Sequence, residues 1–155
     1  LNQLNTYENG EIEFIMFGGH SISEEFKNSK NINDYGFIKS KKKLRDIYHK
    51  CDIYLFLSNQ DNSPNTVAEA LSCGTPIITI KGNGTDDFCI NNHNSYVLSK
   101  LDCIKIIDKI YILLNNPKKL KSMSLSSRSY AVKNVSQKIS KENFNSLVEE
   151  VLHGS

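Results

Sequence analysis

Short apolar runs alternate along the chain with longer amphipathic segments. A strand buried under helices needs only a few consecutive apolar residues, whereas a surface helix repeats them every three or four positions. The alternation is therefore typical of strand-helix-strand units and a parallel sheet. Five strands are predicted on this basis, at residues 11–17, 33–38, 52–57, 76–80 and 95–98. The third is nearly all apolar, which predicts that it lies at the centre of the sheet.

Helix start and stop signals stand between these strands. Ser21 and Glu24 have the spacing of a capping box. Ser63 and Pro64 form an N-cap and first-position pair for a helix that ends at Gly74. The predicted helices cover residues 22–28, 40–50 and 64–73, a short segment from 85 or 86, two helices after 102 with the second opening at 117, and 141–152. The fold class is therefore α/β, a Rossmann-like parallel sheet flanked by helices.

Composition limits the classes of protein that this chain can be. At 155 residues and 17.6 kDa it matches one ordinary domain, so a single domain over residues 1–155 is predicted. Hydrophobic residues make up 39% and charged residues 23%, enough apolar material for a core. The formal net charge is only +2, so no strong basic field attracts nucleic acid, and no nucleic-acid partner is expected.

Neither a membrane span nor a metal site is predicted. The apolar runs are too short or too interrupted to cross a bilayer, and the N-terminus lacks the layout of a signal peptide, which predicts a cytoplasmic protein. The four cysteines are not arranged as the C-x2-C pairs of a zinc ribbon or a redox dithiol. Each lies in or beside an apolar run, so we interpret them as structural thiols.

Candidate ligand groups collect where the predicted strands end. In open α/β sheets, ligands bind beyond the carboxyl ends of the strands. Here that edge brings together Gly18 and Gly19, Ile38 and Lys39, residues 58–65 and residues 81–85. The sequence therefore predicts the binding site at this edge.

The helix that begins near Ser63 carries the most informative part of that edge. Free N–H groups and the helix dipole make its start an anion site, which is weak evidence alone because many helices begin with Ser-Pro for capping reasons. Asp61 precedes this start and Glu69 follows it inside the helix. A carboxylate can accept two hydroxyl groups at once, as from a ribose, although Glu69 could also simply face water. An anion cradle flanked by two carboxylates suits a nucleotide-sugar.

A family resemblance rests on this same stretch. Residues 57–78 read LSNQDNSPNTVAEALSCGTPII, flanked by GFI at 36–38, GNGTDD at 82–87 and NSYVL at 94–98. The pattern resembles the signature of the group 1, or family 4, retaining glycosyltransferases, which have the GT-B fold and bind a nucleotide-sugar in their C-terminal domain. The resemblance covers roughly residues 11–152.

The resemblance implies roles for individual residues. Asp61 and Glu69 stand where the family has two acidic residues separated by seven others, the first usually Glu. Asp61 would then face the donor sugar as the catalytic residue, and Glu69 would hold the ribose hydroxyls. The backbone around Asn65, Thr66 and Val67 would hold the diphosphate. The other donor-binding candidates are Gly18, Gly19, Ile38 and Ser63.

The resemblance also implies what this chain lacks. The family places an Arg and a Lys after the first strand of the domain, to neutralise the leaving diphosphate. That strand would precede residue 1, and so would the acceptor-binding N-terminal domain, so we expect a piece of an enzyme that is inactive alone. We expect no bound metal or other cofactor, with the nucleotide-sugar as substrate, often UDP-linked, in bacterial polysaccharide or glycoconjugate synthesis.

Two alternative functions and one possible contact with a membrane stay open. The chain could be a non-catalytic subunit that docks on a separate acceptor-binding chain, which an upstream reading frame would reveal. It could also be an epimerase of similar architecture, which product analysis would reveal. Lys41, Lys42 and Lys43 form a basic run that is more often a solvated helix face. In an intact enzyme the run could instead rest on anionic lipid, a peripheral membrane contact.

Overall fold

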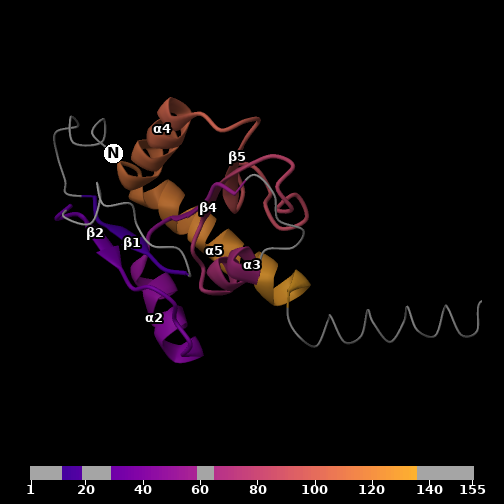
Figure 1. The fold of residues 1–155 in the computed structure, drawn as a ribbon. Helices are drawn as coiled ribbons and strands as arrows, with labels where there is room; N and C mark the ends of the chain where they lie inside the picture. The colour runs from indigo at the N-terminus through magenta and orange to yellow at the C-terminus, as the bar shows by residue number, and fades with distance from the viewer. Residues whose placement is uncertain (1–11, 19–28, 59–64, 136–155) are drawn as a thin grey trace, which may run out of the picture. The chain divides into compact units, whose positions relative to one another are not determined.

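The computed structural model describes residues 12–18, 29–58 and 65–135, and the chain forms two compact units (Figure 1). The boundary between the units falls between Ile47 and Tyr48. The predicted helices over 22–28 and 141–152 lie outside the described residues.

The first unit contains a pair of short strands and most of one helix. Strands β1 (Phe14–Met16) and β2 (Ile32–Asp34) pair in parallel, and helix α2 (Lys41–Lys50) follows and continues into the second unit. The sequence predicted a longer second strand, over 33–38. It ends early because the Asp34 carboxylate accepts a hydrogen bond of 2.8 Å from the N–H of Gly36. Gly36 has a φ of 57°, so the backbone turns out of the extended conformation there.

The second unit is built on a three-stranded parallel sheet. Strands β3 (Tyr54–Phe56), β4 (Ile77–Ile80) and β5 (Ser95–Leu98) lie in the order β3-β4-β5. Strand β4 pairs on both edges and all four of its residues are buried. The prediction that the strand at 52–57 lies at the centre is therefore wrong for the sheet that the structure describes. Two of the three residues of β3 are only half-buried. The apolar sequence of this strand therefore indicates partial burial and does not require a central position in the sheet.

Three helices follow α2 in the described part of the second unit. They are α3 (Asn65–Ser72), α4 (Cys103–Leu114) and the long α5 (Pro117–Asn134), shown in orange in Figure 1. Helix α3 packs on β4 and on α5, and α4 packs on β5 and on α5. Asp102 caps α4 by accepting the N–H of Lys105, and Asn116 caps α5 by accepting the N–H of Lys119. Both starts were predicted from the sequence.

The segment after Gly84 is a turn where a short helix was predicted from residue 85 or 86. The Thr85 carbonyl accepts the N–H groups of Phe88 and Cys89, which makes one turn. The side chain of Asn94 accepts a hydrogen bond of 2.7 Å from the N–H of Ile90 and donates one of 2.9 Å to the Phe88 carbonyl. In a longer helix these two backbone groups would bond to other backbone groups. The helix therefore cannot extend.

The cysteines differ in their surroundings. None of the four forms a disulfide. Cys89 is buried, and burial raises the pKa of its thiol to about 11, as expected of a structural thiol. Cys103 is exposed at the start of α4, so the prediction of a structural thiol is wrong there. An apolar neighbour in the sequence does not bury a residue that begins a surface helix.

Large apolar side chains remain on the surface of the two long helices. Ile104 of α4 is 66% exposed and Leu125 of α5 is 63% exposed. In residues 12–18, 29–58 and 65–135, no helix is long and apolar enough to cross a membrane.

Candidate functional site

The start of α3 presents backbone donors beside a carboxylate. The first N–H groups of a helix have no carbonyl partner within it, and the dipole adds partial positive charge there. In α3 these groups belong to Asn65, Thr66 and Val67. The Asn65 side chain is exposed, Thr66 is half-buried, and the Val67 side chain is fully buried. Because Val67 is buried as a whole residue, the predicted contact between its N–H group and a ligand stays a prediction.

Glu69 lies one helical turn further along the same side of α3. Residues three and four apart share a helix face, so Glu69 is next to both Thr66 and Asn65. The buried face carries Val67, Ala70 and Leu71. Glu69 is exposed, so its carboxylate is open to a ligand in solution. The helix start and the carboxylate thus form one continuous polar face.

A tyrosine that the sequence analysis did not single out links these groups. The Tyr48 hydroxyl lies 3.3 Å from Oε2 of Glu69 and 3.2 Å from the backbone oxygen of Thr66, and it shares its one proton between these two acceptors. Tyr48 is 1% exposed. Burial raises the pKa of its hydroxyl far above the usual range, and nearby Tyr54 and Glu69 raise it further. The hydroxyl therefore stays protonated and remains a donor.

A buried polar network ties together the carboxyl ends of β3 and β4. Asn83 follows β4 and is 1% exposed. Its amide donates to the Ser58 carbonyl at 3.0 Å and to Thr79 Oγ1 at 3.1 Å, and its Oδ1 accepts from Thr85 Oγ1 at 2.7 Å. The prediction that residue 58 and residues 81–85 meet at one edge is confirmed. Asn83 holds this edge in place.

Replacing Asn83 with alanine is expected to lower the free energy of unfolding by about 1 to 3 kcal/mol, because the buried hydroxyls of Thr79 and Thr85 and the carbonyl of Ser58 each lose a hydrogen bond. Asn91→Ala is the matched control. Asn91 also accepts a backbone bond, from Val97, but it is exposed and water can replace the bond. Urea unfolding followed by circular dichroism compares the two, and equal losses would contradict a buried anchoring role for Asn83.

Two predicted site residues belong to the first unit. The N–H of Gly18 donates to the Gly36 carbonyl at 2.9 Å, which joins the carboxyl ends of β1 and β2. Gly18 has a φ of 129°. Ile38 is half-buried in the segment between β2 and α2, outside the strand in which it was predicted. Asp61, Ser63 and Gly19 lie outside the described residues, so their roles stay predictions.

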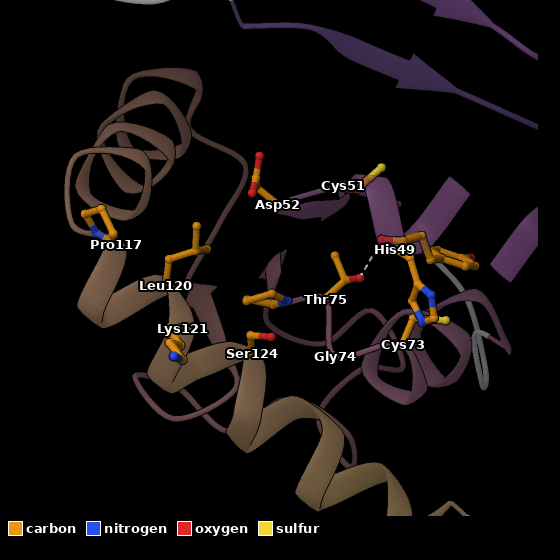
Figure 2. A pocket seen from close by; sticks show the side chains of 12 residues that line it. His49, Cys51, Asp52, Cys73, Gly74, Thr75, Pro117, Leu120, Lys121 and Ser124 are labelled. Atoms are coloured by element: carbon orange, nitrogen blue, oxygen red, sulfur yellow. Dashed lines mark hydrogen bonds between the residues drawn. The ribbon is translucent and has the colours of Figure 1, made fainter. Parts of the chain in front are cut away.

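A cavity of about 310 Å³ lies at the other edge of the second unit's sheet, near the amino ends of β3 and β4 (Figure 2). Asp52, which precedes β3, and Thr75, which precedes β4, line it together with Leu120 and Ser124 of α5. Figure 2 shows Thr75, whose hydroxyl donates to the Tyr48 carbonyl at 3.0 Å. This cavity is at the edge opposite to the predicted ligand edge.

Acidic, thiol and imidazole groups do not gather for a metal in the described part of the chain. No three of His, Cys, Asp and Glu side chains come together there as a metal site would need. The lysines at 41, 42 and 43 are exposed on α2, and Nζ of Lys43 lies 5.4 Å from the centre of the Tyr35 ring. This is the solvated helix face that the sequence analysis favoured.

Comparison with known proteins gives a family match over most of the chain. The model of a family described as glycosyl transferases group 1 matches residues 3–130. A curated relative, 2-deoxystreptamine N-acetyl-D-glucosaminyltransferase of Niallia circulans, is 26% identical over 126 residues. The alignment covers 77% of this chain and 32% of that protein.

Solved structures agree on the fold. Sucrose-phosphate synthase from Thermosynechococcus elongatus superposes with a TM-score of 0.79 at 16% identity, over 91% of this chain and 39% of that one. HepE from Anabaena, solved in complex with UDP, superposes with a TM-score of 0.75 at 14% identity, over 93% of this chain and 41% of that one. The chain spans less than half the length of each of these relatives.

Proposed function

Because the chain belongs to the glycosyl transferases of group 1, we propose that the polar face of α3 holds the nucleotide part of a nucleotide-sugar donor. One observation carries the proposal. The first described turn of α3 and the Glu69 carboxylate lie on one side of the helix, and the Tyr48 hydroxyl contacts both the Thr66 carbonyl and Glu69.

Each part of this face fits a different part of the donor. The N–H groups of Asn65 and Thr66 suit a diphosphate, since they lie in the first described turn of α3, at the positive end of the helix dipole, and neither residue is fully buried. The exposed Glu69 carboxylate suits the two hydroxyls of a ribose, since each oxygen can accept one of them. Structural relatives solved with UDP and with UDP-glucose support a uridine nucleotide as the first probe.

The reaction that we propose is a transfer that retains the configuration of the sugar. The bond between the anomeric carbon and the diphosphate oxygen breaks, and the diphosphate leaves with the electron pair. The acceptor forms the new bond to the same carbon and gives up a proton. The start of α3 stabilises the negative charge that develops on the diphosphate. Asp61 faces the sugar in this proposal. The donor diphosphate is stabilised without a bound metal, and a further domain supplies the acceptor. The setting would be the synthesis of a bacterial polysaccharide or glycoconjugate.

Titration of the ¹⁵N-labelled chain with UDP tests donor binding. Amide resonances of Thr66, Val67 and Glu69 are expected to shift in a saturable way at up to millimolar UDP, and UDP-glucose is expected to shift the same set. GDP and ADP report the preference for the base. If none of these nucleotides moves the three resonances, donor binding by this face is wrong.

A further inference from the structure

We propose that Tyr48 is a positioning residue that holds the Glu69 carboxylate ready for the ribose, an inference that rests on the proposed function. Tyr48 does not reach the ligand face itself, because its side chain is buried. It acts through the hydrogen bond of 3.3 Å from its hydroxyl to Oε2 of Glu69.

The position of the Tyr48 hydroxyl is fixed from several sides. The Tyr48 ring packs edge-on against the ring of Tyr54, with 5.6 Å between the ring centres. The Tyr48 carbonyl accepts a hydrogen bond of 3.0 Å from the Thr75 hydroxyl. A ring held this way has little rotamer freedom, so the position of its hydroxyl is fixed relative to α3.

A hydrogen-bond donor at a fixed position matters for Glu69. Its side chain is exposed and has several rotatable bonds, so a free glutamate would lose rotamer entropy each time that it bound a ribose. The bond from Tyr48 restricts this motion before the ligand arrives. Oε1 and the remaining lone pair of Oε2 stay available as acceptors.

The same hydroxyl also sets a distance within the site. It donates to the backbone oxygen of Thr66 at 3.2 Å, in the first turn of α3. The carboxylate that would hold the ribose is thus tied to the turn that would hold the diphosphate. In a nucleoside diphosphate these two groups are a fixed number of bonds apart, so a fixed separation favours binding.

A purely structural role makes a different prediction. A buried tyrosine hydroxyl requires a partner in any case, and Glu69 and Thr66 could serve only that purpose. Removing the hydroxyl would then change stability and leave discrimination for the ribose hydroxyls unaltered. A positioning role requires a loss that depends on those hydroxyls.

Tyr48→Phe separates the two roles, because it keeps the ring and removes only the hydroxyl. Dissociation constants are measured by NMR titration with UDP and with 2′,3′-dideoxy-UDP. We expect Tyr48→Phe to weaken UDP binding by about 3- to 10-fold, the range for one hydrogen bond, and to leave binding of the dideoxy compound unchanged. Equal effects on both nucleotides, or no effect on either, would overturn the proposal.

Ser127→Ala is the matched control for loss of a buried hydroxyl. Ser127 is fully buried in α5, and its hydroxyl bonds only backbone oxygens, those of Asn94 and Met123. It should lower stability and leave the ratio of the two dissociation constants unchanged. A change in that ratio as large as that of Tyr48→Phe would show that general loosening explains the effect, and would contradict positioning.

Glu69→Gln distinguishes failure of this inference from failure of the proposed function. If Glu69→Gln does not alter the preference for UDP over the dideoxy compound, Glu69 does not read the ribose and the proposed function is wrong in that part. If it does and Tyr48→Phe does not, only the positioning role is wrong. In the double variant, the Tyr48 change should add nothing further.

A measurement on the unaltered chain covers the case in which Tyr48→Phe does not fold. ¹³C relaxation of the Glu69 side chain reports its order with and without UDP. A positioned carboxylate is already ordered in the free chain. A side chain that becomes ordered only when UDP is added would overturn the proposal.

Discussion

Replacing Glu69 with alanine is expected to weaken UDP binding by about 10- to 100-fold, the largest effect of any single substitution on the proposed donor site. The reason is that hydrogen bonds to a charged acceptor are stronger than neutral ones, and this carboxylate would accept up to two of them from the ribose. NMR titration of the Thr66 and Val67 amides measures the loss. UDP-glucose should lose affinity by the same factor, since its ribose is identical.

The control is a carboxylate of equal charge elsewhere in the second unit. Asp108 is exposed in α4, and Asp108→Asn removes one negative charge, as Glu69→Ala does. Asp108→Asn is expected to leave the dissociation constant for UDP within about twofold of the original, because an exposed charge outside the site acts only through a screened field. A greater loss for UDP-glucose than for UDP would contradict the ribose role, because it would place Glu69 at the sugar.

Elements with local signals were predicted well from the sequence. Strand β5 matches its predicted range of 95–98. Helices α4 and α5 begin next to Asp102 and Asn116, whose side chains cap them. A cap bonds an N–H only three residues away, so the sequence contains both partners within a short window. Helices with such local signals can therefore be predicted without knowing which distant residues they contact.

Elements that depend on distant partners were predicted less well. The helix predicted from residue 85 or 86 is a single turn because the side chain of Asn94 takes its backbone groups. Strand β4 occupies the middle of the three-stranded sheet because it pairs with both β3 and β5. The hydrophobic pattern shows neither the hydrogen bonds of Asn94 nor the neighbours of β4. It indicates which residues are buried, and it does not give the order of the strands.

The same division applies to the candidate site. Thr66 and Glu69 belong to one motif and lie on one helix face, so the sequence was enough to select them. Tyr48 is 21 positions away from Glu69, and Asn83 is 25 positions away from Ser58. In a hydrophobic pattern, a tyrosine at helical spacing such as Tyr48 is indistinguishable from any other apolar position. The available signal was chemical: a tyrosine buried on a helix face requires a partner for its hydroxyl.

Leu71→Ala should lower the free energy of unfolding by about 2 to 5 kcal/mol, the range for a buried leucine that leaves a cavity. Leu71 is fully buried in α3, the helix that packs on both β4 and α5. Loss of its side chain therefore weakens the support of the helix that carries Glu69. Urea unfolding followed by far-ultraviolet circular dichroism gives the difference from the original chain.

Leu125→Ala makes the same chemical change on a neighbouring helix. Leu125 is 63% exposed on α5, and leucine and alanine both favour helix, so the expected loss is below about 0.5 kcal/mol. The contrast isolates burial, because residue type and secondary structure are held constant. Equal losses for the two variants would mean that Leu125 is covered in solution, and that the surface of α5 contacts another segment or another molecule. A small loss for Leu71→Ala would instead contradict the packing of α3 between β4 and α5.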